Sequence, residues 1–220
     1  MKHIRQKRKV GRPPKTGLGA EENPLSDKTQ EERRMLFLET AARLFETRGY
    51  SETSVKDITD ELGFTKSVFY YYWDNKKEII QEIHDRALRE VNERLDEVEA
   101  EHDLPQERIE AAIRAHLRSV LQNRSLTAVH LGDLHLSEET HDRKRAYTRR
   151  FQRLMEDGIA AGVIREQDPK ILAFAILNVC NALTTWYSPT GHLSPEEVED
   201  FYVSFILHGS ATPLFDPADG

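Results

Sequence analysis

The stretch TKSVFYYYW gathers hydroxyl, ammonium and phenol groups within a few residues of one another. At the start of a short exposed helix, such groups can reach base edges in a DNA groove, while helix amides and flanking hydroxyls bind phosphates. The chemistry that this stretch predicts is therefore recognition of a nucleic acid. The residues that would carry it are Thr65, Lys66, Ser67, Tyr70 and Tyr71.

Histidine also suggests a chemical role, because the chain has nine. The combinations nearest in sequence are His130 and His135 with Asp133, and His141 with Asp142. A spacing of five does not bring two side chains together on a helix, and no short metal-binding motif is present. The sequence also lacks a glycine-rich phosphate loop, a Gly-x-Ser-x-Gly elbow and a Cys-x-x-Cys pair. We therefore expect no enzyme, no catalytic residue, no metal and no cofactor.

Charge is divided unevenly along the chain. The first twenty residues hold seven lysines and arginines and no acid, although the formal net charge of all 220 residues is -7. Taking those seven from the 31 basic residues leaves 24 against 38 acidic ones in the rest of the chain. This asymmetry indicates contact with nucleic acid or a membrane surface, and the alternative is a solvated tail.

The elements that must position these groups are helices. Apolar residues recur at spacings of three and four without strand-like alternation, which predicts an all-α protein of about nine helices. The N-terminal patterns predict helices over residues 30–49, 53–63, 65–73 and 75–101, with Gly63 in a tight turn between the second and third. Two short helices joined in this way constitute a helix-turn-helix.

A family resemblance follows from these residues. The stretch AARLFETRGYSETSVKDITDELGFTKSVFYYYWDNKKEII resembles the DNA-binding domain of TetR-family transcriptional regulators over residues 33–82. The recognition helix departs from the family, which more often has a histidine and a phenylalanine where this chain has Tyr71, Tyr72 and Trp73. The resemblance therefore implies the fold but leaves the choice of operator open.

The resemblance also implies roles for single residues. Lys66, Ser67, Tyr70 and Tyr71 would contact the major groove and its phosphates, and Lys76 would hold a phosphate at the start of the fourth helix. Packing is the expected role of Val68, Phe69, Tyr72 and Trp73, because a short helix must be anchored by its apolar side. The further residues that we expect to contact DNA are Thr53, Ser54 and Thr65, together with Arg12 and Lys15 of the arm.

The arm can reach the adjacent minor groove from its place before the helix-turn-helix. Its GRPPK segment resembles the core of an AT-hook, with Arg12 as the groove residue, although Val10 stands where the full hook has another arginine. Deletion of residues 1–20 should therefore flatten the salt dependence of DNA binding.

The C-terminal half predicts an interface and a ligand site. A helix formed by residues 169–187 would have almost no polar face, which predicts a helix that is buried on all sides. A last helix is expected to begin near Ser194. The resemblance implies that these two helices form a homodimer, which predicts a palindromic operator. The expected interface residues are Leu183, Val198, Phe201, Tyr202, Phe205 and Ile206.

This half looks like the branch of the family that regulates fatty-acid and steroid catabolism, whose inducers are often acyl-CoA thioesters. A pocket with apolar walls would lie among residues 105–187. The candidate ligand residues are Phe151, Leu154, Asn178, Asn181, Thr184 and Trp186, with Arg143, Arg145, Arg149 or Arg150 for a phosphate or carboxylate. The alternative is that the apolar candidates are core residues and the arginines a solvated face.

The sequence thus predicts a basic arm (1–29), a helix-turn-helix domain (30–78), a ligand-binding and dimerisation domain (79–212) and a tail (213–220). The expected function is that of a homodimeric repressor released from operator DNA by a small molecule, and control by a partner protein is the alternative. The longest apolar run, residues 171–180, is too short to span a bilayer, no signal peptide is expected, and the single cysteine fits a reducing cytoplasm. An enclosed cavity in the C-terminal domain would favour the small molecule over the partner.

Overall fold

Residues 28–132 and 137–209 are described by the structure, which is a computed structural model. Within these two ranges the chain contains helices and no strand, so the all-α prediction is confirmed. The helices are α1 (Gln30–Arg48), α2 (Val55–Glu61), α3 (Lys66–Tyr72), α4 (Lys76–Glu101), α5 (Pro105–Gln122), α6 (Arg124–Leu131), α7 (Glu138–Ala160), α8 (Pro169–Asn181), α9 (Leu183–Trp186) and α10 (Pro195–His208).

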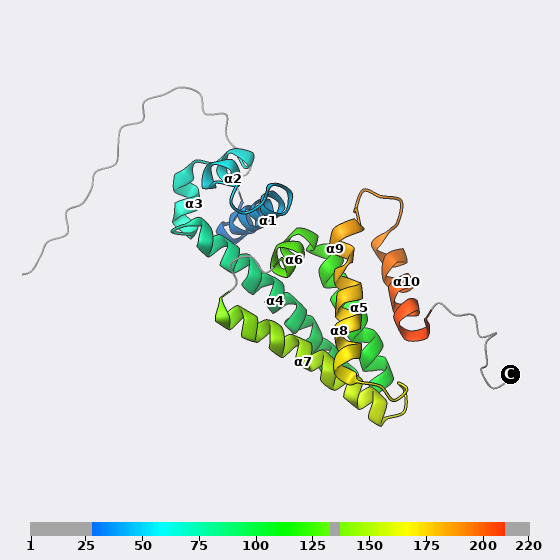
Figure 1. The fold of residues 1–220 in the computed structure, drawn as a ribbon. Coiled ribbons are helices and arrows are strands. Elements are labelled where there is room, and N and C mark those ends of the chain that lie inside the picture. Colours follow the sequence, from blue (N-terminus) through cyan, green and yellow to red (C-terminus); the bar gives the residue numbers. More distant parts are fainter. Residues whose placement is uncertain (1–27, 133–136, 210–220) are drawn as a thin grey trace, which may run out of the picture.

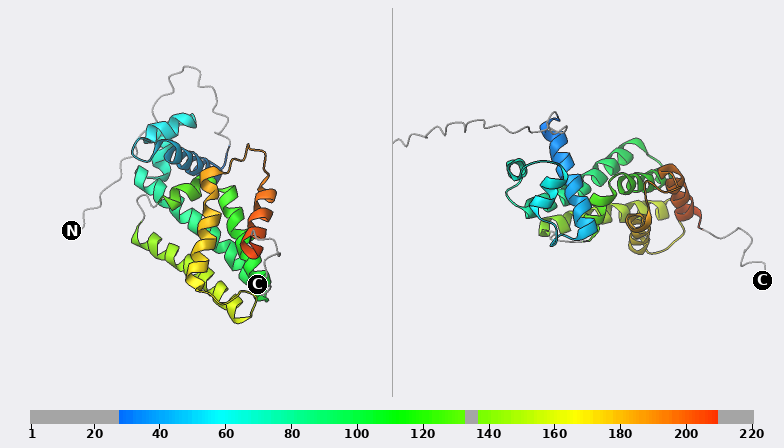
Figure 2. Two further views of the ribbon diagram at one scale, coloured as in Figure 1. Left: turned by 45° about the vertical axis from the view of Figure 1, so that its right-hand side comes forward. Right: turned by 90° about the horizontal axis from the view of Figure 1, so that it is seen from above.

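Two groups of helices lie at opposite ends of the molecule, and α4 connects them (Figure 1). Helices α1, α2 and α3 gather at one end, whereas α5, α7, α8 and α10 lie towards the other, as the views in Figure 2 also show. With 26 residues, α4 is about 39 Å long at 1.5 Å per residue. It is long enough to contribute to both groups.

An aromatic core holds the N-terminal helices together. The ring of Phe37 stacks on that of Phe64 at 5.5 Å between centroids and meets Phe69 edge-on at 6.0 Å. Leu126 and Val129 of α6 are buried in the same core. Helix α6 follows α5 in the sequence but packs against the N-terminal helices, so it links the two parts of the molecule.

A second core lies between α4, α5, α7, α8 and α10. Ile113, Leu117 and Phe151 are among its fully buried side chains. Cys180, the only cysteine of the chain, packs here as a small apolar residue, as the sequence predicts. Burial raises the pKa of its thiol to about 12.

The C-terminal helices differ from the sequence-based expectation. Residues 169–187 form two helices, because α8 ends at Asn181 and the short α9 follows Ala182. The expectation that this segment is buried all round is wrong within a single chain, since Ile171 and Phe174 are exposed. Helix α6 has no counterpart among the predicted helices, because its eight residues span only about two turns, too few for Leu126, Val129 and His130 to stand out as a periodic pattern.

Candidate functional site

Helices α2 and α3 are joined by a tight turn. Ser54 caps α2, since its hydroxyl accepts from the Asp57 N–H at 3.2 Å while the Asp57 carboxylate accepts from the Ser54 N–H at 2.7 Å. Gly63 has a φ of 66°, which costs other residues roughly 1 to 2 kcal/mol. The Phe64 N–H donates to the carbonyl of Thr59 at 2.9 Å. The unit is the helix-turn-helix that the sequence predicts.

The inner side of α3 is fixed to two neighbouring helices. Phe69 and Trp73 are buried, which confirms the packing role predicted for them. The indole Nε1 of Trp73 donates to Oε2 of Glu82 in α4 at 2.6 Å. Arg34 of α1 donates to the same oxygen through Nη2 at 2.9 Å. These bonds hold the orientation of α3, as precise recognition requires.

The outer side of α3 presents the residues singled out in the sequence. Lys66 and Ser67 are exposed, and Tyr70 and Tyr71 are 51% and 65% exposed despite their aromatic rings. The hydroxyls of Thr65 and Ser67 lie 2.7 Å apart. The Tyr71 hydroxyl accepts from the side-chain amide of Gln30 at 3.0 Å. Amines, hydroxyls and phenols therefore share one exposed helix face.

Two other candidates have internal partners. Thr53 is buried, and its hydroxyl donates to the carbonyls of Leu44 at 3.3 Å and Gly49 at 2.8 Å. A DNA contact by the Thr53 side chain is therefore corrected to a structural role at the end of α1. The ammonium of Lys76 donates to the carbonyls of Tyr50 at 2.5 Å and Thr53 at 2.8 Å. It also lies over the Tyr50 ring, and burial lowers its pKa.

The remaining candidates fall in different places. Ser54 is exposed, although its hydroxyl is engaged in the cap of α2. Arg12 and Lys15 lie outside the described residues.

A cavity of about 500 Å³ lies among α4, α5, α6, α7 and α8. This volume is within the range of small-molecule sites in proteins. Of the predicted ligand residues, Asn178, Asn181 and Thr184 line it. Most of the surface that lines it is apolar, and the described side chains around it include Lys144 but no aspartate or glutamate.

Three polar side chains of the cavity wall form a chain of hydrogen bonds across three helices. His116 of α5 lies with Nδ1 2.9 Å from the hydroxyl of Tyr147 in α7. Its Nε2 lies 3.1 Å from Oδ1 of Asn181 in α8. Burial lowers the pKa of His116 to about 4 and raises that of Tyr147. Both rings are therefore uncharged at neutral pH.

Sequence reasoning does not find His116 or Tyr147 as cavity residues. Their positions could have indicated this role, because both lie on the apolar face of a helix. His116 continues the apolar spacing of Ile109 and Ile113, and Tyr147 precedes Phe151 by one turn. A polar group at such a position is either bonded in the core or faces a cavity.

Three predicted ligand residues lie away from the cavity. Phe151 and Leu154 are packed in the second core, so the core interpretation is correct for them. Trp186 is half exposed, and its Nε1 donates to the Tyr202 hydroxyl at 3.3 Å. It belongs to the outer surface of α9.

The arginines proposed for an anionic ligand do not line the cavity either. Arg143 pairs with Asp85, and Arg145 pairs with Asp142. Arg150 pairs with two acidic residues of α4, and Arg149 is exposed. The solvated-face interpretation therefore describes this run better than a ligand role.

Exposed apolar side chains lie on α8 and on α10 and are together called the apolar face. Phe201 and Phe205 are 65% and 41% exposed, and their rings stack at 6.2 Å between centroids. The exposed Ile171, Phe174 and Val179 lie on α8.

Leu183 and Val198, by contrast, are buried within the chain itself, so the interface role predicted for them is corrected to core packing. Tyr202 and Ile206 are partly buried.

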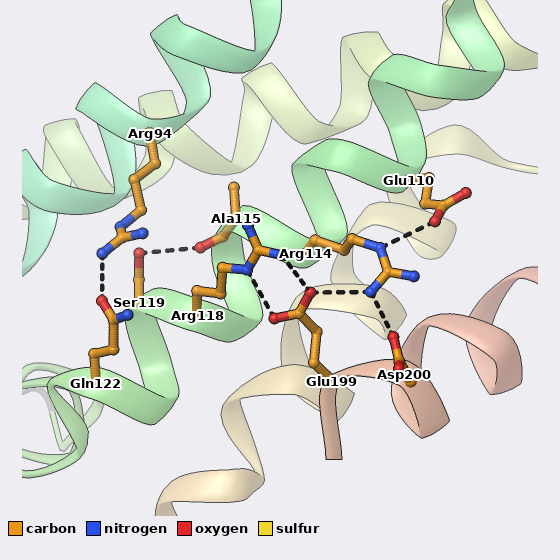
Figure 3. Close-up of polar contacts among 9 residues, drawn as sticks. All are labelled: Arg94, Glu110, Arg114, Ala115, Arg118, Ser119, Gln122, Glu199 and Asp200. Carbon is orange, nitrogen blue, oxygen red and sulfur yellow. Dashed lines mark hydrogen bonds and ion pairs between the residues drawn. The ribbon is translucent and has the colours of Figure 1, made fainter. Parts of the chain in front are cut away.

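Ion pairs fix α10 on α5 (Figure 3). The Glu199 carboxylate, which is nearly buried, accepts from Arg118 Nε and Arg114 Nη1 at 2.8 and 2.9 Å. Arg114 also pairs with Asp200 at 2.8 Å and with Glu110 at 3.0 Å. The last helix is thus held in place before any partner binds.

Among residues 28–132 and 137–209, no group of three or more histidine, cysteine, aspartate or glutamate side chains could hold a metal ion. His135 and Asp133 lie outside these ranges. No helix of the described part is both long and apolar enough to cross a membrane.

The fold and the exposed face of α3 define a helix-turn-helix DNA-binding protein. Residues 37–83 match the family model described as bacterial regulatory proteins, tetR family, and residues 102–210 match the tetracyclin repressor-like C-terminal domain. Together the two models span more than half of the sequence. The chain belongs to the TetR family of transcriptional regulators.

Individual relatives agree with this assignment. The HTH-type transcriptional repressor KstR2 of Rhodococcus jostii RHA1 is 27% identical over 188 residues, which are 82% of this chain and 92% of the relative. A TetR/AcrR-family regulator from Thermobifida fusca YX-ER1 is 33% identical with a TM-score of 0.62, covering 82% of this chain and all of that one. AibR in complex with isovaleryl coenzyme A and operator DNA is 27% identical with a TM-score of 0.69, covering 80% and 98%.

Proposed function

We propose that the protein is a homodimeric repressor that binds a palindromic operator in the cytoplasm and releases it when a small molecule enters the cavity. The exposed face of α3 carries this proposal, because Lys66, Ser67, Tyr70 and Tyr71 have no role in the core. Two such faces related by a two-fold axis would enter successive major grooves about 34 to 36 Å apart. The basic arm would add minor-groove and phosphate contacts through Arg12 and Lys15.

The cavity favours a small molecule over a partner protein as the controlling signal. A partner needs a surface, whereas a ligand needs a concave site with apolar walls and a few polar groups, which this cavity provides although it is open on one side. The structure of AibR with isovaleryl coenzyme A supports an acyl-CoA thioester as the ligand class.

Release would follow from thermodynamic linkage between the two sites. The ligand would bind better to a conformation in which the spacing of the two recognition helices no longer matches the operator. The ligand then lowers the affinity for DNA by a certain factor, and DNA lowers the affinity for the ligand by the same factor. Helix α6 is placed for this coupling, because Thr127 lines the cavity while Leu126 and Val129 are buried in the core of the N-terminal helices.

Selection from a random pool of duplexes, followed by fluorescence anisotropy, tests the DNA site. We expect a palindrome whose half-site centres lie one helical turn apart. Lys66→Ala should weaken binding about tenfold, because it removes a contact to the duplex. Arg153→Ala is the matched control, since it removes an exposed positive charge from α7, which is not part of the helix-turn-helix. Equal losses in both variants would mean that α3 is not the recognition helix.

Deleting residues 1–20 tests the arm separately. Each phosphate contact contributes roughly 0.9 to the slope of log affinity against log salt concentration. The slope should become shallower in the truncated protein, and an unchanged slope would make the arm a passive tail.

A further inference from the structure

The chain of hydrogen bonds in the cavity wall has a fixed direction. Oδ1 of Asn181 can only accept, so Nε2 of His116 carries the proton of that bond. The other ring nitrogen of a neutral imidazole must accept, and the Tyr147 hydroxyl therefore donates to Nδ1. Tyr147 thus selects the tautomer of His116, and His116 in turn holds the side-chain amide of Asn181 in one orientation.

This arrangement leaves hydrogen-bond donors at the cavity. The bond to His116 uses the oxygen of the Asn181 amide, and no hydrogen bond within the described part of the chain uses its Nδ2. Asn181 lines the cavity. Asn181 is partly buried and its amide is held in one orientation, so its N–H groups are preorganised donors for an acceptor on a ligand in the cavity.

Resting on the function proposed above, we propose that Asn181 recognises the carbonyl oxygen of an acyl thioester whose acyl chain fills the cavity. His116 and Tyr147 are positioning residues that act through Asn181. Neighbouring Leu88, Val91 and Leu177 provide apolar contacts for the chain.

The dimensions of the cavity agree with an acyl group more than with a whole coenzyme. About 500 Å³ of largely apolar space suits an acyl chain, whereas the pyrophosphate and adenosine of coenzyme A are too large and too highly charged for it. Phe174, Asn178 and Thr185 line the cavity and are also exposed, so they mark its opening. The coenzyme would lie outside the cavity, past these residues.

A pair of ligands that differ only at the carbonyl tests the proposal. Hexanoyl-CoA has a thioester carbonyl, and S-hexyl-CoA has a methylene group in place of that carbonyl. We expect calorimetry on the full chain to show about tenfold tighter binding of the thioester, the effect of one hydrogen bond to a preorganised donor. Equal binding of both compounds would overturn the role of Asn181 while leaving the proposed ligand class intact. Binding of neither would overturn both.

Substitutions then assign the preference to the amide. Asn181→Leu should remove the preference for the thioester and leave the affinity for S-hexyl-CoA within about threefold. Tyr147→Phe should reduce the preference without abolishing it, because the amide stays but its orientation is no longer fixed. Asn92→Leu is the control, since its amide bonds to the Leu88 carbonyl and it does not line the cavity. A preference that survives in Asn181→Leu would contradict the assignment, and the comparison in the unaltered protein holds even if that variant fails to fold.

Discussion

His116, a buried side chain of the cavity wall, should make the free energy of unfolding depend on pH. Its pKa is about 4 in the folded protein, and an unfolded histidine titrates near 6.5. Between these values the unfolded chain binds more protons, so the free energy of unfolding should fall as the pH decreases through this window. The expected loss due to His116 is about 3 kcal/mol between pH 7 and pH 4.

Urea denaturation of the unaltered protein and of His116→Gln at several pH values measures this loss. Other groups titrate equally in both proteins, so the difference between the two pH profiles isolates His116. Parallel profiles would show that His116 is not a neutral buried imidazole.

At the residue scale, the sequence predicts which side chains of α3 are exposed better than it predicts the internal ones. Lys66, Ser67, Tyr70 and Tyr71 could be found because their types and their spacing along a short helix depend on local order alone. Thr53 is of a suitable type as well, but its burial results from the packing of α1 against the following turn. His116 was missed for the same reason, since a cavity is a property of several helices.

At the element scale, the placement of α10 depends on Glu199. Its carboxylate is nearly buried between two arginines, and replacing it with leucine would leave Arg114 and Arg118 without their shared acceptor. We expect Glu199→Leu to lower the free energy of unfolding by about 1 to 3 kcal/mol, because a charged hydrogen-bond partner is lost. Urea denaturation gives this value.

Asp200→Ser is the control for this prediction. Asp200 pairs with the same Arg114, but its side chain is largely exposed, so its removal should cost less than about 1 kcal/mol. Equal losses in the two variants would contradict a special role for burial at Glu199.

The helices themselves follow from sequence to different degrees. α2 could be predicted because Ser54 and Asp57 form a local cap and Gly63 ends it. α6 could not, since a helix of eight residues gives too short a pattern and depends on its packing against α1 and α4. The sequence could not predict that one side of α8 is exposed in the single chain. Residues buried within a chain and residues buried against a partner are both apolar, so the two cases have the same sequence pattern.

At the scale of the whole molecule, the apolar face of α8 and α10 predicts the oligomeric state. Large apolar side chains gathered on the exposed sides of two helices mark an interaction site. Phe201→Glu should convert the proposed dimer to monomers at micromolar concentration, because it places a charge where aromatic rings would be buried. Analytical ultracentrifugation measures the change, and operator affinity should fall at least tenfold with it.

Ala146→Glu serves as the control, since it adds the same charge to an exposed position of α7. Dissociation caused by this variant, or a Phe201→Glu protein that remains a dimer, would place the interface elsewhere.

The burial of Cys180 has a practical consequence for spectroscopy. A protonated thiol enclosed in the core reacts slowly with maleimides, so the unaltered protein should be labelled very little by thiol-directed dyes. A cysteine introduced at the exposed Glu52, beside the helix-turn-helix, would therefore be labelled selectively in each subunit. Energy transfer between two such dyes would report the separation of the recognition helices directly, with and without an acyl thioester.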